Sequence, residues 1–356
     1  MKQYYYNDFK KILQSNFQCN KARLNYLTLL IISLIDVATV RLNRISLKIK
    51  SGTKHQSNYR NLQRFFQKFK MNYQDYAKFI ISTLPKQEKY YLVIDRTNWK
   101  FGNTAINILM LGIIYKNNAI PLFWELLDKG GSSSTRERKE ILSKAIALMG
   151  KDKIQALLGD REFIGVKWFK YLIDEGIEFH IRVPKQIKRG SVLKKGRKTI
   201  NNLFRFLKPM GKLDYPKQVD ILGYRLYVSG MKSTNKEYCV IVSSKSNIDS
   251  LSKYQKRWTI ENMFGAFKTK GFNFEDTHLR NLERIKKLIV VVSIAYFWSI
   301  MIGLWLENVN PIKLKKHKRK SISTFRYGFD YLTYIIKNIL DYFDEFKVLT
   351  KILSCT

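Results

Sequence analysis

Cysteine is scarce in this sequence, with three residues in a chain of 356. Cys19, Cys239 and Cys355 are far apart and odd in number, which argues against a disulfide framework and against a zinc knuckle. The sequence therefore predicts a reducing, intracellular environment. The first residues, MKQYYYNDFKK, lack the apolar stretch of a secretory signal, so an exported precursor is not expected.

Acidic residues are also few, because 28 Asp and Glu stand against 65 Lys and Arg and leave a formal net charge of +37. A surplus of this size predicts a polyanionic partner. Nucleic acid is the first choice, since neutralised phosphates release counterions and supply most non-specific affinity. An anionic membrane surface is the alternative.

Charge is missing altogether from residues 288–306, which read LIVVVSIAYFWSIMIGLWL. Such a run is long enough to cross a membrane. It stands alone, however, and closely follows a charged helix, so a helix buried in a protein core is the favoured interpretation. We therefore expect no contact with a membrane.

Five regions are predicted along the chain. Residues 1–86 have apolar positions at helical spacing and many basic residues, which predicts a helical DNA-binding domain or, alternatively, a solvated scaffold. Residues 87–183 and 250–306 are predicted to form two parts of one α/β core. A β-rich insertion at 184–249 separates them, and a basic helical region follows at 307–356. The insertion and the last region carry one-sided basic runs, which favours contact with phosphates over a merely solubilising surface.

Short apolar runs predict the strands of the core. They are residues 90–94, 106–115, 120–127, 154–158 and 177–183. Two of these strands lead to a carboxylate, because the first ends on Asp95 and the fourth is followed by Asp160. A carboxylate at the end of a buried strand is unfavourable unless it has a partner or a function.

A late segment, residues 252–271, reads SKYQKRWTIENMFGAFKTKG and is predicted to be one helix. One face of this helix would present Tyr254, Arg257, Glu261 and Lys268. The neighbouring face would pack on a core through Ile260, Met263, Phe264 and Phe267. Trp258 lies beside the charged face. An ordinary amphipathic helix is the alternative, but one carboxylate between two cations and two aromatic residues suits a metal and a phosphate backbone better than solvent.

The order of strands and helices is that of a ribonuclease-H-like fold, in which the first and fourth strands are neighbours and the late helix crosses their ends. Asp95, Asp160 and Glu261 would then converge. Magnesium prefers oxygen ligands, and two such ions can activate an attacking oxygen and stabilise a leaving one. Three unrelated structural acids are the alternative. From the residues alone, a metal-dependent nuclease or recombinase follows.

The whole chain resembles the DDE transposases of bacterial insertion-sequence family four, which share a Tyr, Arg, Glu, Lys signature. Here that signature is Tyr254, Arg257, Glu261 and Lys268. The stretches VIDRT around Asp95, GDREF around Asp160, KGFNFEDTHL and FRYGFDYL carry the same resemblance.

The resemblance implies that Asp95, Asp160 and Glu261 hold two Mg²⁺ ions, for which Mn²⁺ can substitute. It also implies that Tyr254, Arg257 and Lys268 of the signature bind DNA. Better-known members excise their element through a DNA hairpin in which aromatic residues hold a flipped base, and Trp258 matches one such position. A second tryptophan expected in the insertion is absent. Members act as synaptic homodimers on double-stranded DNA, namely the terminal inverted repeats and the target.

The sequence therefore predicts a cut-and-paste DNA transposase of the bacterial cytoplasm and nucleoid, with a ribonuclease-H-like core, a basic β-rich insertion and helical terminal regions. A catalytically silent DNA-binding protein derived from a transposase is the alternative. A basic membrane protein is the third hypothesis.

Overall fold

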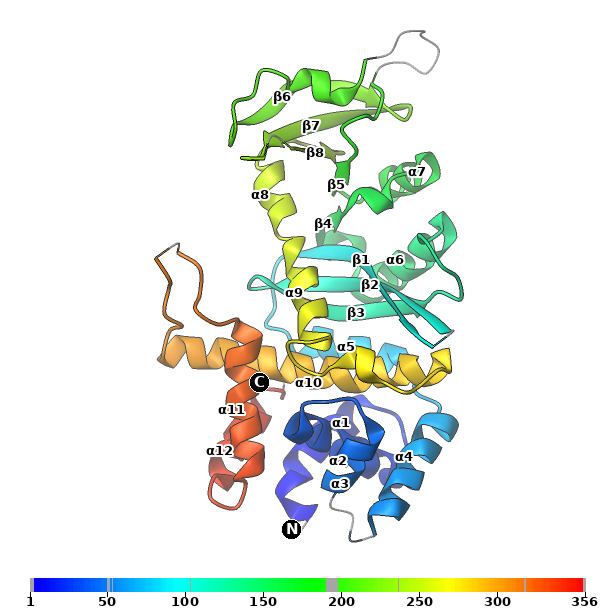
Figure 1. Ribbon diagram of the computed structural model, residues 1–356, viewed down its shortest axis with the longest axis vertical. Helices are drawn as coiled ribbons and strands as arrows, with labels where there is room; N and C mark the ends of the chain where they lie inside the picture. The colour runs from blue at the N-terminus through cyan, green and yellow to red at the C-terminus, as the bar shows by residue number, and fades with distance from the viewer. Residues whose placement is uncertain are drawn as a thin grey trace. The chain divides into compact units, whose positions relative to one another are not determined.

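The computed structural model describes residues 3–49, 52, 54–102, 104–189, 198–235, 237–316 and 318–354. Cys355 and residues 190–197 of the basic insertion lie outside this part of the chain. Cys19 and Cys239 are free thiols. The chain forms two compact units (Figure 1). The helical unit comprises Met1–Pro85, Asn98–Ile106 and Met263–Thr356, and the sheet unit comprises Lys86–Thr97 and Asn107–Asn262.

The sheet has eight strands in the order β3-β2-β1-β4-β5-β8-β7-β6. The first five are β1 (Tyr90–Phe101), β2 (Thr104–Tyr115), β3 (Asn118–Leu126), β4 (Ile154–Gly159) and β5 (Phe179–Val183). The predicted neighbourhood of the first and fourth strands is confirmed, because β1 and β4 pair in parallel. One boundary was wrong: β1 does not end on Asp95 but continues to Phe101. The strand continues because β2 lies beside β1 in the sheet.

The three strands of the insertion extend this sheet. They are β6 (Lys212–Ile221), β7 (Tyr224–Lys232) and β8 (Tyr238–Ser243). β8 pairs antiparallel with β5, from His180 opposite Ser243 to Val183 opposite Val240. The insertion is β-rich, as predicted, but it continues the sheet of the core.

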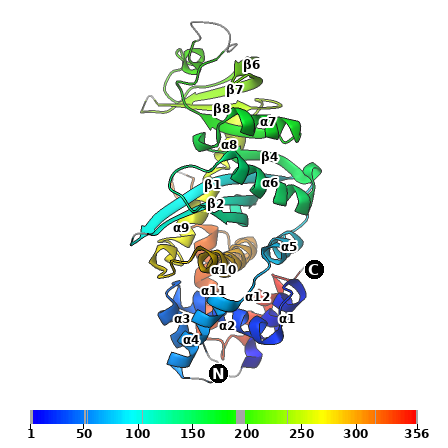
Figure 2. The ribbon, with the colours of Figure 1, turned by 90° about the vertical axis from the view of Figure 1, so that its right-hand side faces the viewer.

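Two helices connect the central strands, α6 (Thr135–Met149) and α7 (Val166–Asp174). α6 begins with a capping box in which the Ser134 side chain accepts from the Glu137 backbone and the Glu137 carboxylate accepts from the Ser134 N–H. α7 places Trp168, Phe169 and Leu172 in the core. Both helices lie on one side of the sheet (Figure 2).

The helical unit draws its helices from both ends of the chain. The N-terminal ones are α1 (Asn7–Asn16), α2 (Lys21–Val37), α3 (Leu42–Lys48), α4 (His55–Lys68) and α5 (Tyr73–Thr83). The C-terminal ones are α10 (Leu282–Val309), α11 (Thr324–Lys337) and α12 (Phe343–Lys351). The predicted helical character of both terminal regions is confirmed.

The long apolar run lies in α10. By length and composition this is the one helix among the described residues that could span a membrane alone, and α2 with α3 qualify only as a pair bent by 105°. Most of α10 is buried, including 83% of its most apolar window. α11 approaches α10 so closely that a Cβ at Gly303 or Gly328 would overlap backbone atoms of the other helix. The prediction of a buried helix is confirmed.

Candidate active site

Asp95 and Asp160 follow the last paired residues of two adjacent parallel strands. Ile94 of β1 lies opposite Gly159 of β4, so both aspartates leave the β1–β4 ladder at the same edge. Each carboxylate accepts a hydrogen bond from the next backbone N–H, Asp95 from Arg96 at 2.8 Å and Asp160 from Arg161 at 2.7 Å. These local bonds fix the two side chains close to the strands that carry them.

Arg257 links two of the predicted carboxylates. Its Nη1 lies 3.2 Å from Oδ2 of Asp95, and its Nη2 lies 2.5 Å from Oε1 of Glu261. The side chain of Arg257 is only 8% exposed. Its guanidinium lies 5.5 Å from the ring centroid of Tyr254, whose hydroxyl is 3.5 Å from Oδ1 of Asp160. Five of the predicted site residues therefore form one connected cluster in the sheet unit.

The helix that carries this cluster is broken, and the prediction of one continuous helix was wrong. α8 (Ser250–Gln255) ends before Arg257, and α9 (Trp258–Phe267) begins after it. At the break, backbone N–H groups bond to the third residue before them, as from Arg257 to Tyr254 and from Ile260 to Arg257. This tighter winding separates the two helices. The predicted apolar face of α9 is buried.

Two predicted DNA-binding residues lie outside this cluster. Trp258, the first residue of α9, is 60% exposed. Lys268 follows the end of α9 and belongs to the helical unit, where its Nζ lies 2.7 Å from Oε1 of Glu275. Lys268 also lies over the ring of Trp99, 5.8 Å from its centroid. In the described arrangement Lys268 is thus already paired within its own unit.

Burial and charge act against each other at this site. The pKa of Asp95 is raised to about 6: burial is the largest cause and the nearby Asp160 and Glu261 add to it, whereas the Arg96 N–H and Arg257 act in the opposite direction. Burial opposes the charge on Arg257, but Tyr254, Glu261 and Asp95 outweigh burial and raise the pKa of the guanidinium. Arg257 therefore stays charged and compensates the carboxylates.

A second layer of residues, which the sequence interpretation missed, joins the neighbours of the two aspartates. Arg96 Nε lies 2.9 Å from Oε1 of Glu162, and Arg96 Nη1 lies 3.0 Å from Oδ1 of Asn107. Asn107 in turn donates to the carbonyls of Lys129 and Gly131. The signal was present, because the VIDRT and GDREF stretches place an Arg and a Glu of opposite charge just after Asp95 and Asp160.

The oxygens of Asp95, Asp160 and Glu261 are the ligand type that magnesium prefers, but the three carboxylates do not lie close enough together to share one ion. Within the described part of the chain, no three Asp, Glu, His or Cys side chains lie close enough to share an ion. The guanidinium of Arg257 bonds to both Asp95 and Glu261. The Nε of Arg257 is buried and has no hydrogen-bond partner among the described residues. Asp95, Asp160 and Glu261 would hold a metal only after Arg257 released two of them.

The comparison with known families decides the identity. Residues 86–298 match the family described as Transposase DDE domain, and this range includes both aspartates, Glu261 and every strand of the sheet. The chain belongs to the DDE transposase family. A search of curated proteins found none that matches it. A transposase acts on DNA, and membership therefore accounts for the net charge of +37. Transposases of this type generally use divalent metal ions.

Proposed function

We propose that this transposase cuts DNA at the ends of its own insertion sequence and joins the freed 3′ ends to target DNA. In this proposal it belongs to the family-four branch and has a ribonuclease-H-like core. The observation that carries the proposal is the β1–β4 register, which leaves Asp95 and Asp160 side by side. Further support comes from Arg257, which connects Asp95 to Glu261.

In the proposal, Asp95, Asp160 and Glu261 hold two Mg²⁺ ions, or Mn²⁺ in their place. Such ions, when bound, activate the attacking oxygen and stabilise the leaving oxygen of a phosphodiester. Arg257 keeps the carboxylates charged and close together in the free protein. Arg257 and Tyr254 then contact phosphates near the cut, and Lys268 does so once it leaves Glu275. The protein would act as a homodimer on paired element ends.

A second candidate is a DNA-binding protein without catalytic activity. The pairing of Arg257 with Asp95 and Glu261 favours it, because this pairing occupies the carboxylates. Nicking of a supercoiled plasmid in the presence of Mg²⁺ separates the two candidates. The active transposase nicks the plasmid, and the silent protein binds it without nicking.

Binding to DNA should weaken steeply with salt. The insertion contributes many Lys and Arg, and residues 313–326 contain seven with no acid. Each phosphate that they neutralise adds about 0.9 to the slope of log affinity against log salt concentration. Fluorescence anisotropy with a labelled duplex at several salt concentrations measures this slope. A nearly flat plot would contradict the proposed contacts.

Trp258→Ala should affect one step selectively if the enzyme forms a DNA hairpin. The exposed indole can stack on a flipped base, which is worth about 1–3 kcal/mol. The first nick should proceed normally, while hairpin formation slows about tenfold, at about 1.4 kcal/mol per decade. Both rates are measured on one substrate, together with the melting temperature. Equal loss of both steps with a lower melting temperature would mean that Trp258 is structural.

A further inference from the structure

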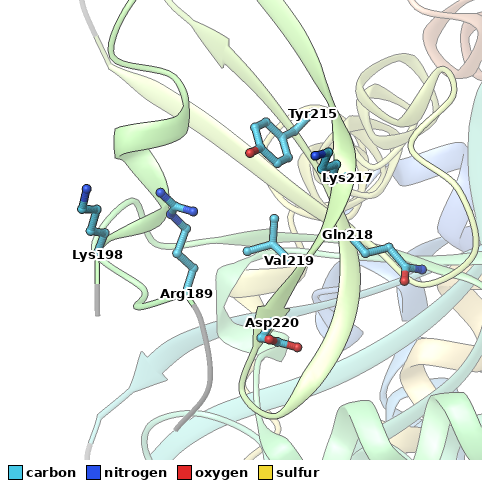
Figure 3. Close-up of a pocket in the computed structure, with 7 residues that line it drawn as sticks. All are labelled: Arg189, Lys198, Tyr215, Lys217, Gln218, Val219 and Asp220. Atoms are coloured by element: carbon cyan, nitrogen blue, oxygen red, sulfur yellow. The ribbon is translucent and has the colours of Figure 1, made fainter. Parts of the chain in front are cut away.

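The extended sheet contains a basic cavity that is not part of the carboxylate cluster. Its volume is about 330 Å³. One wall carries Arg189 and Lys198, and the other is the middle of β6, with Tyr215, Lys217 and Asp220 (Figure 3). All five side chains belong to the sheet unit. The cavity therefore lies within the sheet unit.

The backbone shapes the two walls in different ways. The Arg189 N–H donates to the Lys198 carbonyl at 3.0 Å, and Arg189 also forms an isolated bridge with Ile221 at the end of β6. In β6 the pairing with β7 is interrupted, because Tyr215 lies opposite Val228 but Val219 lies opposite Leu226. The residues between them, 216–218, therefore form a bulge, which the missing N–H of Pro216 favours. Lys217 projects from this bulge.

The charges around the cavity are not compensated. Three cations line it against a single acid, Asp220. Among the described residues, the side chains of Arg189, Lys198 and Lys217 have no ion pair and no hydrogen bond. In addition, the Nε of Arg189 is buried and has no acceptor among these residues. A buried donor without an acceptor is unfavourable, and an anion in the cavity would satisfy it and relieve the repulsion between the cations.

We propose that this cavity binds one phosphodiester group of the DNA backbone. The inference rests on the proposed function, because it takes DNA as the ligand. Arg189 and Lys217 would donate to the phosphate from opposite walls, and Lys198 would add charge. Gln218 also lines the cavity, but its side chain points away from Arg189 and Lys198 (Figure 3), which leaves the proposed phosphate contact to the cations. The contact is therefore independent of DNA sequence and holds the strand in position.

The test measures binding of a random-sequence duplex, without metal, at several salt concentrations. Lys217→Gln and Arg189→Gln should each weaken binding about three- to tenfold at low salt and lower the salt slope by about 1. Arg189→Lys should bind the duplex more tightly than Arg189→Gln but more weakly than the wild type, because lysine keeps the charge but lacks the planar fork of donors. Asp220→Asn should change binding in the opposite direction and strengthen it about two- to threefold.

Matched controls remove the general effect of net charge. Lys153→Gln removes an exposed lysine elsewhere in the sheet unit, and Asp214→Asn removes an exposed acid from β6 outside the cavity. Both should change affinity less than about twofold. Equal effects of Lys217→Gln and Lys153→Gln would overturn the cavity assignment. So would equal effects of Asp220→Asn and Asp214→Asn.

The outcomes also separate this inference from the proposed function. Wild-type protein that fails to bind DNA contradicts both. Wild-type protein that binds and nicks DNA, with unchanged salt slopes in Lys217→Gln and Arg189→Gln, contradicts the cavity alone. Inorganic phosphate serves as a further probe. Stabilisation of the wild type by millimolar phosphate, with no effect of these two variants on DNA binding, would assign the cavity to small anions and overturn the proposal.

Discussion

Replacing Asp95, Asp160 or Glu261 by Ala should reduce DNA strand cleavage to below about one hundredth of the wild-type rate. Binding to DNA should change less than about threefold, because these carboxylates would bind metal ions and not phosphates. Asp95 and Asp160 leave the β1–β4 ladder at the same edge, and Arg257 pairs with both Asp95 and Glu261. Gel assays of nicking and anisotropy assays of binding, on the same preparations, measure the two effects.

A control acid keeps this prediction specific. Asp152 is exposed and lies just before β4, outside the carboxylate cluster. Asp152→Ala should cleave DNA like the wild type. Asp95→Asn is a useful companion, because it keeps the shape of the side chain beside the buried Arg257. Cleavage by Asp95→Asn above a few per cent of the wild-type rate would remove Asp95 from the catalytic set.

Replacing Arg257 by Gln should lower the melting temperature in the absence of magnesium and make it rise more on adding Mg²⁺ than in the wild type. The variant leaves Asp95 and Glu261 facing one another without their shared cation. Removing one partner of a buried ion pair costs about 3–5 kcal/mol. Glu261 is 38% exposed, so we expect a smaller loss here, about 2 kcal/mol. The melting temperature in EDTA should then fall by about 5 °C.

Magnesium should reverse much of this loss, since two carboxylates freed from Arg257 bind a cation more readily. The rise in melting temperature on adding Mg²⁺ should therefore be larger for Arg257→Gln than for the wild type. Cleavage should still fall at least about a hundredfold, because the guanidinium can no longer bind a phosphate. For Arg257→Lys, the rise in melting temperature on adding Mg²⁺ should lie between those of the wild type and Arg257→Gln, since an ammonium group cannot donate in the same way to both carboxylates. Equal magnesium shifts in all three proteins would contradict this role for Arg257.

The core could be predicted from the sequence because its strands contain apolar runs that are separated by clear turns. Asp95 and Asp160 follow two of these runs, and the parallel pairing of the runs places both aspartates at one end of the β1–β4 ladder. α10 could be predicted as a core helix because its long apolar run stands alone in the sequence and closely follows a charged helix. β6 was harder to predict, because Pro216 and several charged residues interrupt its pattern.

The details of the cluster depended on three-dimensional contacts that helical spacing alone does not contain. The spacing of Tyr254, Arg257 and Glu261 indicated one face of one helix, but tight turns divide the segment at Arg257. Spacing also could not show that Arg257 pairs with a strand residue, Asp95, 162 positions away. The pairing of Arg96 with Glu162 likewise depends on the adjacency of β1 and β4, which the sequence predicted without the contact itself. The roles of these residues in catalysis remain predictions.

The most direct test of the central claim is the nicking of a supercoiled plasmid that carries the two ends of the element. Wild-type protein should nick it in Mg²⁺ and lose this activity in EDTA, and Asp160→Ala should bind the plasmid without nicking it under either condition. Nicking that persists in EDTA, or in Asp160→Ala at the wild-type rate, would contradict a metal-dependent reaction at these carboxylates.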